Sequence, residues 1–157
     1  MFSNIDAGWA DFELPGTYTY GLSYLTPVPF EWLDAAIHGL ETLQPFCVKG
    51  YLEPGRMICT VSYRNCYVIC EDDDRAVEDA NKLPFKCSTM GMLEFCQQLA
   101  DDIQRDLDAW AGFYSHCEDS DLPANKQRLL QKLERLRELT EQRRDTFAEG
   151  QMFIGWL

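Results

Sequence analysis

The sequence predicts one domain of the α+β class, in which an antiparallel β-meander packs on one short helix and on a C-terminal antiparallel helical hairpin. Residues 17–90 contain several β-forming segments separated by turn dipeptides, and residues 91–149 show two long stretches of helical periodicity. The 157 residues are enough for one buried core. An N-terminal segment, 1–16, precedes these parts, and an apolar tail, 150–157, follows them.

The first third of the chain predicts one strand and one helix. We expect residues 1–16 to be irregular, because glycines and a proline interrupt them. Thr17–Tyr24 alternates and is rich in β-forming residues, which is typical of a strand. Phe30–Leu43 places apolar residues at helical spacing and is followed by a proline, so we expect an amphipathic helix there.

Residues 46–89 predict the meander. Phe46–Glu53 and Arg56–Tyr63 flank the turn dipeptide Pro54-Gly55, and Cys66–Glu71 reads as a third strand. Pro84–Thr89 is expected to add an edge strand. Alternate residues of the second strand are apolar, which indicates a sheet that is covered on one face.

Two long helices are expected to form the hairpin. The first begins at a cap provided by Ser88 or Thr89 and runs to about Ser115, along the clearest apolar stripe in the chain. The second is Ala124–Phe147, which begins just after a proline and ends before a glycine.

The two predicted helices differ in charge. Met92–Asp121 contains eight acidic residues and one arginine, a net charge of −7, whereas Pro123–Ala148 contains seven basic and four acidic residues, a net charge of +3. This difference favours pairing of the two helices, although each exposed ion pair contributes less than about 1 kcal/mol. The tail 150–157 either packs on the domain or inserts into a partner.

The whole chain has a net charge of −12, which disfavours direct contact with nucleic acid and with anionic membranes and favours a basic protein partner. No apolar run approaches the roughly 20 residues that span a bilayer. The N-terminus lacks the features of a secretory signal, so we expect a cytoplasmic protein. Its seven cysteines are then reduced thiols, most of them buried.

Two acidic clusters are candidates for metal binding. Residues 101–106 (DDIQRD) have the outline of an aspartate-rich magnesium motif, but Ile103 identifies the buried side of this helix and the acids fall largely on the opposite, solvated side. Residues 71–74 (EDDD) lack the ligand spacing and the glycine of a calcium loop. We therefore expect no metal at either cluster.

The remaining motifs predict no chemistry. His116 and Cys117 supply two zinc ligands at most, and no other cysteine or histidine has a spacing that completes such a site. The chain contains no phosphate-binding glycine loop and no nucleophile turn. We expect no cofactor and no catalytic residue.

The favoured hypothesis is a non-catalytic acidic protein-binding module that blocks a basic, nucleic-acid-handling protein such as a nuclease or a CRISPR-type effector. By overall character alone, toxin immunity proteins and phage inhibitors of host defence, including anti-CRISPR proteins, are of this kind. The expected partner interface consists of Glu71, Asp72, Asp73, Asp74, Asp101, Asp102, Asp106 and Asp108.

Two alternatives belong to other classes. The first is a structural or assembly protein that forms a homodimer through the leucines between Leu129 and Leu139 on the second long helix. The second is a metal-dependent hydrolase, which would require a bound metal ion.

Overall fold

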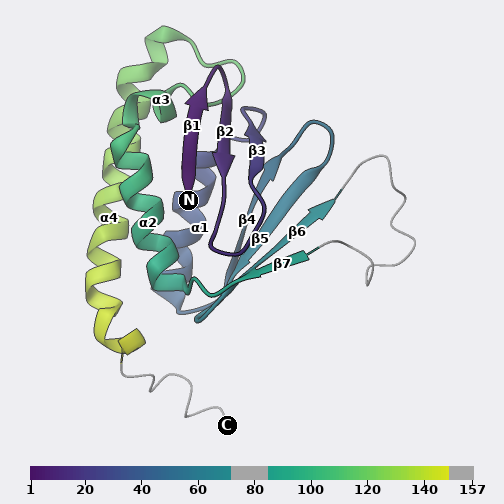
Figure 1. The fold of residues 1–157 in the computed structure, drawn as a ribbon. Coiled ribbons are helices and arrows are strands. Elements are labelled where there is room, and N and C mark those ends of the chain that lie inside the picture. Colours follow the sequence, from purple (N-terminus) through teal and green to yellow (C-terminus); the bar gives the residue numbers. More distant parts are fainter. Residues whose placement is uncertain (72–84, 149–157) are drawn as a thin grey trace.

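The computed structural model describes residues 1–71 and 85–148. It confirms the α+β class: two antiparallel sheets, one of three strands and one of four, lie beside a layer of helices (Figure 1). The buried aromatic and aliphatic side chains between the sheets and the helices form the core. None of the helices in the described ranges is long and apolar enough to cross a membrane.

The three-stranded sheet consists of β1 (Phe2–Asp6), β2 (Trp9–Phe12) and β3 (Tyr20–Ser23) in that order. Each strand is antiparallel to its neighbour. The strand expected at Thr17–Tyr24 is therefore confirmed in its second half, which is β3.

The expectation that residues 1–16 are irregular is wrong, because β1 and β2 form a hairpin within them. Its two-residue turn, Ala7 and Gly8, has positive φ values of 47° and 82°. Turns with this backbone match the right-handed twist of a hairpin, and glycine adopts the conformation without steric cost. The glycine is thus the hairpin turn rather than a break in the structure.

The four-stranded sheet confirms the predicted meander. It consists of β4 (Phe46–Tyr51), β5 (Arg56–Val61), β6 (Cys66–Glu71) and β7 (Phe85–Ser88), in that order and all antiparallel. The strand predicted at Pro84–Thr89 is β7, and it lies at one edge of the sheet.

Period-two alternation decides which face of this sheet enters the core. Met57, Cys59 and Val61 of β5 are buried, together with their neighbours Val48 and Val68 on β4 and β6. The residues between them face the other way. All of the labelled helices lie to the left of this sheet in Figure 1, so no helix of residues 1–71 and 85–148 covers its outer face.

The predicted short helix is confirmed as α1 (Val28–Thr42). The second long helix is confirmed as α4 (Leu122–Ala148), which a short 3-10 turn (Asp119–Asp121) precedes. The expected first long helix is wrong in its extent. It is divided into α2 (Met92–Arg105) and α3 (Leu107–Ala111).

The division occurs at Asp106, whose φ and ψ of −113° and 35° depart from helical values. The predicted cap is also wrong, since α2 begins after Gly91 and has no side-chain cap. A Cβ added at Gly91 would lie 2.6 Å from the carbonyl oxygen of Tyr63, so the start of α2 is in close contact with the β5–β6 turn.

The helices form a layer of more than one hairpin, because α4 contacts both α1 and α2. Ion pairs join α4 to α1 (Lys132–Asp34 and Arg135–Glu41) and join α4 to α2 and α3 (Arg137–Asp101 and Lys126–Asp108). Two of these pairs join the oppositely charged segments, as the sequence predicted. Basic side chains of α4 also form ion pairs with acids of α1.

Four of the five leucines that the dimer hypothesis used are buried inside the chain, whereas Leu130 is 44% exposed. Leu129, Leu133, Leu136 and Leu139 are at most 2% exposed. They belong to the same core cluster as the aromatic rings of Phe2, Trp32 and Trp110. The assembly hypothesis therefore loses most of the apolar surface on which it was based.

Candidate functional site

Three of the predicted interface acids are engaged by basic residues of the same chain. Asp101 lies 3.0 Å from the guanidinium of Arg137, Asp106 lies 2.7 Å from that of Arg105, and Asp108 pairs with Lys126. These pairs are exposed and contribute little to stability. Their effect is to neutralise the acidic side of α2 and α3, so this face is a weak candidate for a basic partner.

Asp102 does not belong to the surface, and its assignment to the partner interface is wrong. Its side chain is buried and accepts hydrogen bonds from the backbone N–H of Phe2 at 2.8 Å, from Arg105 at 2.8 Å and from Gln98 at 3.0 Å. Arg105 also donates to the carbonyl oxygen of Phe2 at 3.1 Å. Asp102 and Arg105 therefore clamp the first strand onto α2.

The electrostatics of this clamp follow from its geometry. The hydrogen bond to Asp106, together with the charges of Asp102 and Asp106, raises the pKa of Arg105 above its ordinary value. An oxygen-seeking cation would have to displace this guanidinium from both carboxylates, which disfavours the magnesium reading of residues 101–106.

The second predicted cluster is only partly described. Glu71 is the last residue of β6 and pairs with Arg56, which lies opposite it on β5. Asp72, Asp73 and Asp74 lie outside the described residues.

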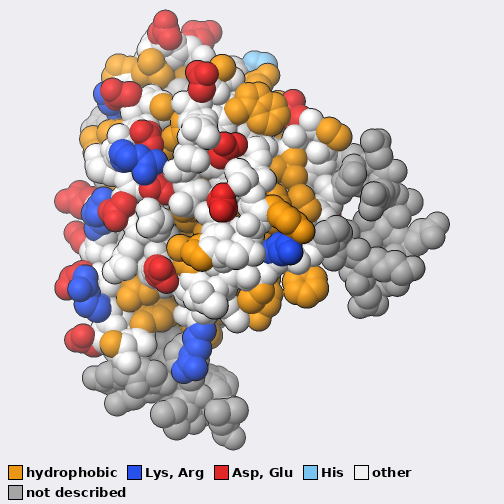
Figure 2. Space-filling model, in the orientation of Figure 1, with side chains coloured by type: hydrophobic (Ala, Val, Ile, Leu, Met, Phe, Trp, Pro, Cys, Tyr) orange, Lys and Arg blue, Asp and Glu red, His pale blue; other side chains and the backbone are white. Residues whose placement is uncertain are grey.

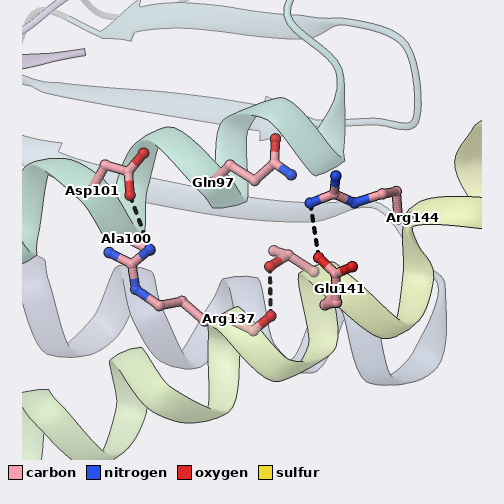
Figure 3. A pocket seen from close by; sticks show the side chains of 7 residues that line it. Gln97, Ala100, Asp101, Arg137, Glu141 and Arg144 are labelled. Atoms are coloured by element: carbon pink, nitrogen blue, oxygen red, sulfur yellow. Dashed lines mark hydrogen bonds and ion pairs between the residues drawn. The ribbon is translucent and has the colours of Figure 1, made fainter.

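A cleft of about 320 Å³ lies between α2 and α4 (Figure 3). Within it Asp101 faces Arg137, and Glu141 lies 2.8 Å from the guanidinium of Arg144. The hydroxyl of Thr140 donates to the carbonyl oxygen of Arg137 at 2.8 Å. Because each of these acids meets a base, the cleft holds two internal ion pairs and offers no uncompensated charge to a ligand.

Two buried thiols have raised pKa values. A hydrogen bond to Cys66 and burial raise the pKa of Cys59, and burial raises the pKa of Cys96. Catalytic thiols require the opposite shift. Within residues 1–71 and 85–148, no three His, Cys, Asp or Glu side chains are close enough to hold a metal ion.

A different group of acidic residues gathers where three segments of the chain meet. Tyr24 donates its N–H to the carbonyl oxygen of Gly8 at 2.8 Å, and its own carbonyl oxygen accepts the N–H of Ser115 at 2.9 Å. These bonds place the β1–β2 turn and the end of β3 beside the loop that leads to the 3-10 turn. We call this surface the acidic end; it consists of Asp6, Trp9, Tyr24, Leu25, Glu118 and Asp119.

The acidic end combines charge with exposed apolar surface. Trp9 and Tyr24 are each 39% exposed and Leu25 is 49% exposed. Asp6 and Asp119 are exposed, and neither forms an ion pair with any lysine or arginine that the structure describes. In Figure 2, acidic side chains lie beside apolar ones at the upper end of the molecule, whereas acidic and basic side chains are interleaved along the helices at the left.

A capping box stabilises the 3-10 turn at the acidic end. Glu118 and Asp121 form a reciprocal capping box, in which the N–H of Glu118 donates to the carboxylate of Asp121 at 3.1 Å. Sequence reasoning missed this surface because its residues come from separate segments. The Asp6-Ala7-Gly8 turn flanked by apolar residues was the available signal for one of them.

An exposed indole can anchor a protein partner, and the tryptophans of this chain differ in exposure. Trp9 is accessible, but Trp110 is fully buried against Phe2 and Phe113 and cannot contact a partner. Trp156 lies outside the described residues.

Comparison of this chain with protein-family models, with curated proteins and with solved structures finds no match.

Proposed function

We propose that this protein is a non-catalytic binding module that docks its acidic end on a basic, nucleic-acid-handling protein and blocks it. The observation that carries the proposal is that Asp6 and Asp119, which form no ion pair with a described base, lie on the same surface as three exposed apolar side chains. The predicted interface acids Asp101, Asp106 and Asp108, by contrast, meet bases of the same chain. We therefore expect the partner to contact the acidic end rather than the acidic side of α2.

Electrostatic attraction and an apolar anchor would act together in this contact. The net charge of −12 raises the rate of encounter with a positively charged surface, most strongly at low salt. An exposed indole or phenol supplies the apolar anchor that a charged rim alone lacks. A groove that binds phosphate also accepts carboxylates, so we expect the partner to be a nuclease or a CRISPR-type effector, and the protein to be an immunity protein or an anti-CRISPR inhibitor.

The proposed place of action is the cytoplasm. Cys47 and Cys87 are exposed thiols. Such thiols persist in a reducing compartment and are oxidised outside it.

The test compares two double variants that each remove two negative charges. Asp6→Asn with Asp119→Asn changes the acidic end, and Glu134→Gln with Asp145→Asn changes two exposed acids of α4 as the matched control. Glu118 and Asp121 are left intact because they hold the turn. The tagged proteins are used to capture a partner from host lysate, and the affinity of each for that partner is titrated at two salt concentrations.

We expect the acidic-end variant to bind more weakly at low salt and to depend less on salt, while the control keeps the affinity of the unmodified chain. Trp9→Ala tests the anchor and should cost about 2 kcal/mol, or roughly 30-fold in affinity, if Trp9 lies at the centre of the contact. Equal losses in the acidic-end and control variants would refute the proposal, because only the overall charge would then matter.

A further inference from the structure

A second surface stands apart from the acidic end: the outer face of the four-stranded sheet. The register aligns Ile58, Ile69 and Phe85 in one row across β5, β6 and β7. Phe85 is 65% exposed, and Tyr67 and Tyr51 on the same face are 39% and 41% exposed. An apolar row of this kind on the open side of a sheet usually marks a contact site.

The dimensions of this face decide against a second copy of the chain. Four strands about 4.8 Å apart and about six residues long cover roughly 400 Å². A stable pair of proteins buries about 800 Å² on each partner. Two copies would also bring together net charges of −12 each.

The C-terminal segment of the same chain has the composition and the starting point to cover the face. Residues 151–157 read QMFIGWL and contain five apolar side chains, two of them aromatic. α4 ends at Ala148, and the ring of Phe147 lies 6.3 Å from that of Tyr63 in the β5–β6 turn. The segment therefore starts at one end of the sheet.

The distance to be covered is within reach. Nine residues, 149–157, span up to about 30 Å when extended, whereas the face is about 20 Å long in the strand direction. The side chain of Asn65 in the β5–β6 turn donates to the hydroxyl of Tyr67 at 3.1 Å, so the turn leads directly onto the outer face. Residues 149–157 contain no basic residue that would repel Lys49 on this face.

We propose that residues 151–157 dock on the outer face of the four-stranded sheet and bury the row of Ile58, Ile69 and Phe85. The occupant is part of the same molecule, so no association is needed and the two apolar surfaces cover each other. This proposal concerns different residues from those of the acidic end, so its test does not depend on the proposed function.

The test uses the full chain with NMR-active methyl groups on its isoleucines. Ile58 and Ile69 report on the outer face, Ile154 reports on the C-terminal segment, and Ile37 and Ile103 report on the helices. We expect cross-relaxation between the Ile154 methyl and those of Ile58 or Ile69.

Two variants on opposite sides of the contact should abolish this signal. Phe153→Ser with Trp156→Ser changes the segment, and Phe85→Ser changes the face at a position that is 65% exposed. Both should shift the methyl resonances of Ile58 and Ile69 and leave that of Ile103 in place. Leu130→Ser, at an exposed leucine of α4, is the matched control and should change neither methyl of the sheet face.

Two outcomes would overturn the proposal. In the first, the methyl resonances of Ile58 and Ile69 do not respond to the changes at Phe153 and Trp156. In the second, the cross-relaxation appears between labelled and unlabelled molecules and sedimentation shows a dimer, so that a second copy supplies the segment.

Discussion

Replacing Asp102 by alanine should destabilise the protein far more than the same change at its neighbour Asp101. The two carboxylates are adjacent in sequence and both lie on α2, but their surroundings are opposite. Asp102 is 1% exposed and accepts the buried N–H of Phe2, whereas the side chain of Asp101 is 63% exposed and pairs with Arg137 at the surface.

The magnitude follows from what each substitution leaves behind. Without Asp102, the N–H of Phe2 is buried without an acceptor, which costs about 1–3 kcal/mol. The side chain of Arg105 is 53% exposed, so the loss of its ion pair adds less than about 1 kcal/mol. We expect a total of about 1–4 kcal/mol for Asp102→Ala, against less than about 1 kcal/mol for Asp101→Ala.

Urea unfolding monitored by tryptophan fluorescence measures both values. With a slope of about 2 kcal/mol per molar urea, the midpoint of Asp102→Ala should fall by about 0.5–2 M, and that of Asp101→Ala by less than about 0.5 M. Asp102→Asn, which keeps an oxygen acceptor for Phe2, should lie between them. If the two alanine variants unfold at the same urea concentration, the N-terminal strand does not depend on Asp102 and the clamp is refuted.

Two further predictions concern the helix layer and the buried thiols. The guanidinium of Arg143 donates to the last carbonyls of α1 at 3.0 and 3.3 Å, so Arg143→Met should cost about 1–2 kcal/mol and lower the melting temperature by several degrees; an unchanged melting temperature would contradict this role. The raised pKa values of Cys59 and Cys96 mean that the folded protein holds protons that unfolded thiols, with an ordinary pKa of 9.0, release. Stability should therefore be complete below pH 9 and fall as the pH rises above it. Urea unfolding at pH 8 and pH 10 measures this loss, which should be smaller in Cys96→Ala; an equal loss in that variant would contradict the assignment.

The sequence predicted best where a local pattern corresponds directly to a structural element. The helical spacing of α1 and α4 and the turn dipeptides between β4, β5 and β6 placed these elements within a few residues. The break at Asp106 was missed because the apolar stripe continues across it into α3, where Trp110 is still buried. A periodic pattern records which side is buried but not whether the helix is continuous.

The wrong assignment of Asp102 to the partner interface has a similar cause. Met92, Phe95 and Leu99 are buried on α2, and Asp102 follows them at the same helical spacing of three and four residues. Position alone therefore placed Asp102 on the buried side, but a charged residue type directed the interpretation toward solvent. The partner that makes its burial tolerable, the backbone of Phe2, is 100 residues away in the chain.

The sequence by itself determined the fold class, most of the strands and helices, and the large negative charge. These properties depend on neighbours within a few residues or on composition alone. Only the tertiary structure decided which acids meet bases, which are buried, and which stay unpaired at the acidic end. The reason is physical: the effective charge of a carboxylate depends on the groups within a few ångströms of it, and here those groups come from segments far apart in the chain.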